Sequence, residues 1–129
     1  MTLARQSEND NAQLFLDWMR KCYAGNGVEL VNWTEDFAKI GREKQKLFLR
    51  YGLHFLRELM ILTTTGNENL RLRGAELATA LRMKTLMPFE KIEPMAHLFD
   101  ECTYHVERNA NPKVLFLDAS IQMNKILRR

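Results

Sequence analysis

Apolar residues recur along most of the chain at the three- and four-residue spacing of an α-helix. The pattern is broadest between Arg42 and Thr64. On a helical projection, the apolar residues of this stretch cover roughly 200°, whereas a helix with one buried side needs only about 100°. They are Phe48, Leu49, Tyr51, Leu53, Phe55, Leu56, Leu59, Met60 and Leu62. We therefore expect this helix to be covered from at least two sides and to form the centre of a bundle.

A narrow polar strip remains on the same helix. It contains Arg50, His54, Arg57 and Glu58. His54 and Glu58 are four residues apart, the spacing at which opposite charges pair on a helix surface. We expect a stabilising pair rather than a reactive histidine, because no serine, cysteine or acid is placed to work with His54.

Two helices are expected before the central one. The first follows a polar lead-in of residues 1–7, with Ser7 as its N-cap, and runs to about Ala24. Glycine and asparagine at positions 25–27 are typical of a helix C-terminus. The second helix spans Val28 to Ile40. Its apolar residues at helical spacing are Leu30, Trp33, Phe37 and Ile40.

Three more helices are expected after the central one, which stops near Thr64. The first lies between Asn69 and Met87, supported by Leu77, Ala80 and Leu81 and less strongly by Leu70 and Leu86. A turn at Pro88 follows, since proline disfavours helix in the preceding residue. The next helix spans about Glu90 to Asn109, with one apolar face and a polar face opposite. The apolar face is Ile92, Met95, Phe99, Cys102 and Val106, and the polar face is Glu93, His97, Asp100, Glu101, Tyr104 and Arg108.

The last helix is expected from Pro112 to about Leu127, with Asn111 as its N-cap and Pro112 as its first residue. We assign these two residues a structural capping role. No stretch alternates as a strand would. The sequence therefore predicts an all-α fold, a compact bundle of five to six helices in one domain over residues 1–129.

The last helix carries two apolar strips, which indicates two partners. The broader one faces the core and contains Leu115, Phe116, Ala119, Met123, Ile126 and Leu127. The second consists of Val114, Leu117 and Ile121. Its partner is either another helix of the same domain or another protein chain. We single out Val114, Leu117 and Ile121 as candidate partner-binding residues.

Composition fits one globular domain with a substantial core. The chain has 129 residues, of which 46% are hydrophobic and 27% charged. No apolar run reaches the roughly 18 to 20 residues of a membrane span, and the first residues lack the apolar segment of a secretory signal. We expect a cytoplasmic protein. Cys22 and Cys102 fall on apolar helix faces and are expected to be buried thiols.

Basic residues gather around the start of the central helix. They are Lys39, Arg42, Lys44, Lys46 and Arg50. Such a cluster could contact phosphates. Glu43 lies among them and they are spread around the helix, which favours a solvated helix start. The net charge of +3 permits nucleic-acid binding without arguing for it.

No residue pattern predicts catalysis. His97, Glu101 and His105 share one helix stripe and could offer zinc ligands, but helical charge pairs explain them more simply. The sequence has no phosphate-binding loop, no dinucleotide fingerprint and no metalloprotease motif. We expect no catalytic residue, no metal site, no cofactor and no small-molecule substrate.

Three segments, taken together, resemble a known family. They are Phe15–Tyr23 (FLDWMRKCY), Ile40–His54 (IGREKQKLFLRYGLH) and Tyr104–Asp118 (YHVERNANPKVLFLD). In this order and at similar spacing they are similar to the C-terminal region of the delta-prime subunit of bacterial DNA polymerase III, particularly that of Bacteroidetes. The similarity covers most of the chain.

The resemblance implies a helical collar domain of a clamp loader. In that family an N-terminal AAA+ module precedes such a domain, and the helical domains of five subunits join in a ring that supports loading of the sliding clamp onto primed DNA. The chain shows none of the AAA+ motifs, so the resemblance implies a domain of a longer protein. Its partners would be the other clamp-loader subunits, with DNA contacted only indirectly. The alternative is a free-standing helical nucleic-acid-binding or regulatory protein that uses the basic cluster near Arg42.

Overall fold

A computed structural model describes residues 3–65, 74–83 and 87–128, including their side chains except those of residues 3–10 and 75. These residues form six α-helices and no strand. The helices are α1 (Leu3–Ala24), α2 (Gly27–Ala38), α3 (Arg42–Thr65), α4 (Ala75–Met83), α5 (Phe89–Glu107) and α6 (Pro112–Leu127). The all-α class and the six helices predicted from the sequence are confirmed.

The start of α1 is the largest boundary difference. The helix begins at Leu3, so residues 3–7 are helical rather than a lead-in, and Ser7 lies inside the helix instead of capping it. Nothing in Leu3–Ser7 opposes this, because the stretch contains no glycine or proline. The capping propensity of Ser7 alone therefore predicted too late a start for the first helix.

The expected breaks between the early helices are where the sequence placed them. Gly25 has φ +73°, a left-handed conformation that ends α1, and Gly41 has φ +95° just before α3. Asn26 caps α2, its side-chain oxygen accepting a hydrogen bond from the Glu29 amide at 3.1 Å. The bounds of α3 agree with the prediction to within one residue.

The helix between α3 and α5 is shorter than the stretch that suggested it. Helix α4 spans Ala75–Met83, with Ala80 buried and Leu77 and Leu81 packed against the core. Leu70 and Leu86, which also entered the prediction, lie outside the described residues.

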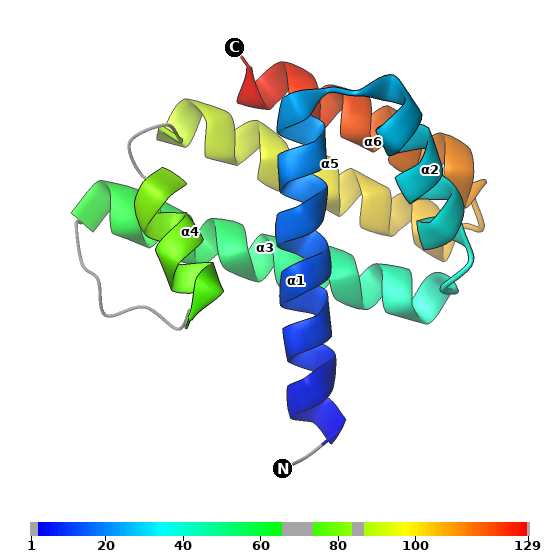
Figure 1. The fold of residues 1–129 in the computed structure, drawn as a ribbon, viewed down its shortest axis with the longest axis horizontal. Coiled ribbons are helices and arrows are strands. Elements are labelled where there is room, and N and C mark those ends of the chain that lie inside the picture. Colours follow the sequence, from blue (N-terminus) through cyan, green and yellow to red (C-terminus); the bar gives the residue numbers. More distant parts are fainter. Residues whose placement is uncertain (1–2, 66–73, 84–86, 129) are drawn as a thin grey trace.

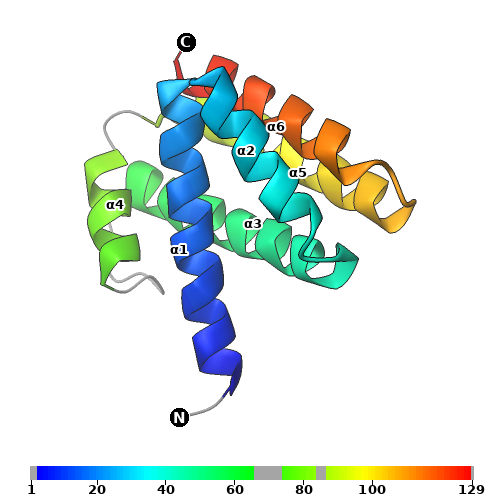
Figure 2. The ribbon, with the colours of Figure 1, turned by 45° about the vertical axis from the view of Figure 1, so that its right-hand side comes forward.

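The central helix α3 is covered from two sides, as predicted. It runs antiparallel to α5, because Arg42 at its start bonds Asn109 just after the end of α5, while Gly52 lies against Phe99. Helix α1 crosses both of them, and α6 lies along the other side of α5 (Figures 1 and 2). Helix α2 packs against α6, and α4 stands beside α1 near the C-terminal part of α3 (Figure 2).

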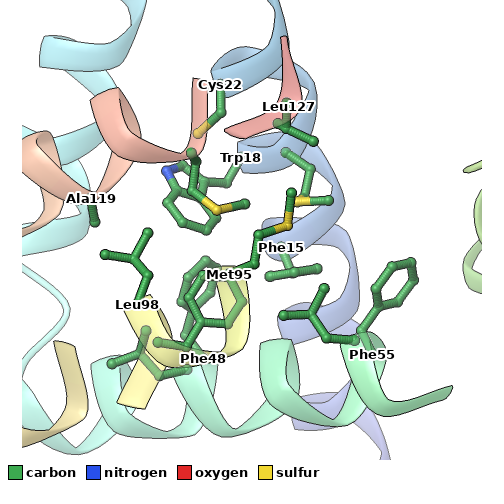
Figure 3. Close-up of a cluster of buried hydrophobic side chains, with 14 of the residues drawn as sticks. Phe15, Trp18, Cys22, Phe48, Phe55, Met95, Leu98, Ala119 and Leu127 are labelled. Atoms are coloured by element: carbon green, nitrogen blue, oxygen red, sulfur yellow. The ribbon is translucent and has the colours of Figure 1, made fainter. Parts of the chain in front are cut away.

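Aromatic side chains fill the point where α1 crosses the other helices. Phe15 is fully buried there, with its ring centroid 5.4–6.1 Å from those of five neighbours. The neighbours are Trp18, Phe48, Tyr51, Phe55 and Phe99. Figure 3 shows Phe15, Trp18 and Phe48 among the side chains that converge between the helices. Tilted and edge-on rings at these distances attract one another in addition to burying apolar area.

One glycine makes this close crossing possible. A Cβ atom added to Gly52, in the middle of α3, would lie 2.8 Å from Phe15 Cε1 and 2.8 Å from Phe99 Cε2. The rings of α1 and α5 therefore occupy the space that any larger residue at position 52 would need. A glycine costs helix stability, and here it permits three helices to approach at one point.

Candidate partner-binding surface

The candidate surface lies on α6, whose start is fixed by the predicted cap. Asn111 has an extended backbone, and its side-chain oxygen accepts hydrogen bonds from the amides of Lys113 at 3.0 Å and Val114 at 3.3 Å. Pro112 follows as the first helical residue, where its missing N–H is not needed. The capping roles of Asn111 and Pro112 are confirmed.

The inner face of α6 is held by contacts that set the rotation of the helix. Trp18 Nε1 donates a hydrogen bond to Ser120 Oγ at 2.8 Å, and both residues are fully buried. Phe116 packs edge-on against Phe37 of α2 with ring centroids 4.6 Å apart. Asn124 Nδ2 donates to the Cys22 carbonyl at 2.7 Å. These contacts fix which side of α6 points outward.

The three predicted partner-binding residues do not share one environment. Val114 is 66% exposed and Ile121 is 44% exposed, whereas Leu117 is half-buried and packs against the core. Val114 and Ile121 are seven residues apart, which places them about 10 Å from one another on the same side of the helix. The domain's own helices therefore cover part of the strip and leave its two ends exposed.

Helix α2 adds two exposed residues that the sequence reasoning missed. Val28 is 72% exposed and Val31 is 40% exposed. Helices α2 and α6 lie side by side and antiparallel, since Phe37 meets Phe116 at one end while Gly25 lies against Asn124 at the other. The two valines are spaced by three residues, off the buried face of α2, and that pattern could have revealed them.

The basic cluster at the start of α3 is partly satisfied within the protein. Lys46 Nζ lies 3.4 Å from Glu43 Oε1, and Arg42 donates a hydrogen bond to Asn109 Oδ1. Lys44 and Arg50 are exposed. This arrangement supports the interpretation of a solvated helix start over a built phosphate site.

The polar strip of α3 differs from its prediction at one residue. Arg50 and Arg57 are exposed and His54 is half-buried, but Glu58 is only 7% exposed. The expected His54–Glu58 pair is wrong, since it does not occur among the ion pairs of the described residues. His54 instead lies near the Tyr51 ring, 6.2 Å between centroids.

One histidine of the α5 stripe pairs with a carboxylate one turn further along the helix. His97 Nε2 lies 2.5 Å from Glu101 Oε1, and both side chains are exposed, so this part of the prediction is confirmed. His105 contacts the Tyr104 ring instead. Within the described part of the chain, no group of three His, Cys, Asp or Glu side chains is arranged to hold a metal ion.

Both cysteines are buried, as predicted. Burial raises the pKa of the Cys22 thiol from 9.0 to about 12, against a smaller lowering by the hydrogen bond with Ser120. Burial also raises the pKa of Cys102 to about 12, with further raising by the charges of Asp118 and Glu101. Thiols with such pKa values stay protonated at neutral pH, so they are poor nucleophiles and metal ligands.

None of the helices in the described ranges is long and apolar enough to cross a membrane. No protein-family model, no curated protein and no solved structure matches the chain.

Proposed function

We propose that the chain is a non-catalytic oligomerisation domain of a bacterial clamp loader, corresponding to the collar domain of a delta-prime subunit. Its role would be to join other clamp-loader subunits and so support loading of the sliding clamp during DNA replication. The observation that carries the proposal is the similarity of three segments, in order, to that family. Residues Phe15–Tyr23, Ile40–His54 and Tyr104–Asp118 carry it.

The packing of these segments supports treating them as one unit. They lie in α1, in the turn before α3 and the first half of α3, and across the junction of α5 and α6. Phe15 of the first segment packs on Phe48 of the second at 5.8 Å between ring centroids. Arg42 of the second segment bonds Asn109 of the third. Residues that carry the resemblance thus meet in the fold.

The outer side of α6 supports an assembly role. Val114 and Ile121 expose apolar surface on a helix whose opposite face is firmly buried. Subunit interfaces are richer in apolar contacts at their centre than the rest of a protein surface. A single exposed valine is ordinary on a soluble protein. Val114 and Ile121 together on one side of α6 make this side of the helix the best candidate for a subunit contact.

The alternative of a nucleic-acid-binding or regulatory protein has weaker support. It relies on the cluster around Arg42, where two of the basic residues already have partners within the protein. The net charge is only +3. Dedicated binders concentrate many more basic residues on one face.

The proposal is tested by mixing the purified domain with each of the other clamp-loader subunits and measuring the mass of the resulting species by light scattering after size-exclusion chromatography. Circular dichroism confirms that the domain is folded. We expect a stable complex with at least one subunit. Failure to bind any of them, with the domain folded, would refute the proposal.

A parallel titration against a fluorescent primed oligonucleotide, at physiological salt, separates the two functions. Fluorescence anisotropy should show no tight complex, because DNA is contacted only indirectly. Tight DNA binding without subunit binding would instead establish the nucleic-acid-binding alternative.

A further inference from the structure

A recess with a volume of about 470 Å³ opens between α1, α4 and the C-terminal end of α6. Its lining is mainly apolar and comes from Leu16, Met19, Met83, Met87 and Leu127. This volume falls in the range of small-molecule sites, roughly 300–1,000 Å³. No local sequence pattern predicts this recess, because its walls come from helices that are distant along the chain.

The apolar wall is recessed rather than spread on the surface. Leu16, Met19, Met87 and Leu127 are each at most 8% exposed. Three of the lining residues are methionines, whose unbranched thioether chains adapt to different shapes. A slender alkyl chain fits such a recess better than a partner helix, which needs a long exposed apolar groove.

Two arginines line the same recess. Arg20 comes from α1 and Arg82 from α4, and both are exposed. Among the described residues neither forms an ion pair, and Arg82 Nη2 reaches only the Thr79 hydroxyl, at 3.4 Å. Among the described residues that line it, the recess therefore has two cationic groups and no acidic group.

Cations at this end of the bundle could also serve to cap helix C-termini, which carry partial negative charge. At the ends of α1 and α6 other residues already do so, whereas Arg82 itself lies in the last turn of α4. Arg128 Nη1 donates to the Tyr23 carbonyl at 3.4 Å, and Lys91 Nζ donates to the Leu127 carbonyl at 3.2 Å. The ends of α1 and α6 thus have cationic partners without Arg20 or Arg82.

From this combination we propose that the recess binds a single-chain amphiphile with an anionic head group, such as a fatty acid or an alkyl phosphate. The alkyl chain occupies the methionine-lined recess. The head group lies at the opening and accepts charge-assisted hydrogen bonds from Arg20 and Arg82, whose planar guanidinium groups suit both carboxylate and phosphate. This proposal is independent of the collar function.

The test titrates the purified chain with decanoate, decyl phosphate, decanol and decyltrimethylammonium, below their micelle concentrations, and follows amide shifts by two-dimensional NMR. We expect the two anions to bind in the recess and to shift residues of α1, α4 and the end of α6. Comparison of decanoate with decyl phosphate tells which head group is preferred. Binding of the anions should weaken as salt is raised, because exposed charges are screened.

Variants locate the head group and the alkyl chain separately. Arg20→Gln and Arg82→Gln should each weaken decanoate binding about tenfold while leaving decanol binding unchanged. Thr79→Trp, which fills the recess, should abolish binding of both ligands. Arg57→Gln removes an exposed arginine of α3 that does not line the recess, and it should change neither affinity.

Several outcomes would overturn the proposal. One is the absence of binding by either anion at millimolar concentration. Another is equal binding of decanoate, decanol and the cationic amphiphile, unaffected by Arg20→Gln and Arg82→Gln, which would mean an apolar cavity without head-group recognition. Shifts that map to the exposed face of α2 and α6 would place the ligand elsewhere. Binding of an acidic helical peptide, but of none of the small amphiphiles, would make the recess a protein-docking site instead.

Discussion

The indole N–H of Trp18 donates a hydrogen bond to the hydroxyl of Ser120 across 102 residues of sequence, with an N–O distance of 2.8 Å. Ser120 in turn donates to the Phe116 carbonyl one turn earlier in α6, at 2.7 Å. Both side chains are fully buried, so neither polar group has water as an alternative partner. This short chain of hydrogen bonds joins α1 to α6 in the core and sets the rotation of α6.

Ser120→Ala should lower the free energy of unfolding by about 1–3 kcal/mol, because it leaves the buried Trp18 N–H without an acceptor. Urea unfolding followed by tryptophan fluorescence measures the loss. The matched control is Thr103→Ala, which removes a hydroxyl that only donates to the carbonyl one turn back, at 2.9 Å, and orphans no donor. Equal effects of the two substitutions would show that the Trp18 hydrogen bond contributes nothing.

Gly52→Ala should destabilise the fold, although alanine is the better helix former. The new methyl group would lie 2.8 Å from the Phe15 and Phe99 rings. Overpacking costs about 1–3 kcal/mol and outweighs the gain of about 1 kcal/mol in helix propensity. Gly27→Ala is the control, because a methyl group there meets no atom within 4 Å, and it should be neutral or slightly stabilising. A melting temperature raised by Gly52→Ala would contradict the close approach of the three helices.

Stability should fall steeply in alkali. The pKa values of Cys22 and Cys102 are raised from 9.0 to about 12 in the folded protein, mainly by burial. Between pH 9 and 12 the unfolded chain loses these protons while the folded protein keeps them. Each thiol therefore removes about 1.4 kcal/mol of stability per pH unit in this range, and the effect is absent below pH 9.

Urea unfolding at a series of pH values checks this dependence. The double variant Cys22→Ala and Cys102→Ala should flatten the alkaline slope, whatever its stability at neutral pH. Burial also raises the pKa of Tyr51, helped by its hydrogen bond to Glu76, so part of the slope should remain in the variant. An unchanged slope would mean that the thiols ionise as easily in the folded protein as in the unfolded chain.

Asn111→Ala should lower the free energy of unfolding by about 1 kcal/mol, because two amides at the start of α6 lose their acceptor. Thermal unfolding followed by circular dichroism measures the change. Asn32→Ala, at an exposed position inside α2, removes the same side chain where it caps nothing. It should change stability by less than about 0.5 kcal/mol. If Asn32→Ala lowered the stability as much as Asn111→Ala does, the stabilising role of the Asn111 cap would be contradicted.

Features that depend on neighbouring residues along the chain were predictable from the sequence. Asn111 and Pro112 predicted the start of α6, and the broad apolar arc of α3 predicted a helix covered from two sides. The burial of Ser120 could not be predicted, because a serine beside an apolar arc resembles a polar boundary unless the opposing Trp18 is known. Glu58 was predicted to lie on the polar strip of α3, but it is only 7% exposed.

The surfaces were less predictable than the core for a physical reason. Periodicity tells which side of a helix is apolar, but not whether another helix covers it. Leu117 is half-buried whereas Val114 is exposed, although both belong to one strip. The recess beside Arg20 and Arg82 depends on how α4 is placed next to α1, and no local pattern specifies that placement.

Whether the outer side of α6 is a subunit contact is the central question. The most direct measurement is the affinity of the folded double variant Val114→Asp and Ile121→Asp for the other clamp-loader subunits, compared with the unchanged domain. Leu117 is left intact because it also packs against the core. Leu47→Asp is the control, since Leu47 is similarly exposed, at 41%, but lies on α3.

We predict that the double variant remains folded and loses binding by at least about 100-fold, because two charges would be buried unpaired in the interface. Leu47→Asp should bind as tightly as the unchanged domain. Assembly that survives both α6 substitutions, in a folded domain, would contradict the assignment of this surface.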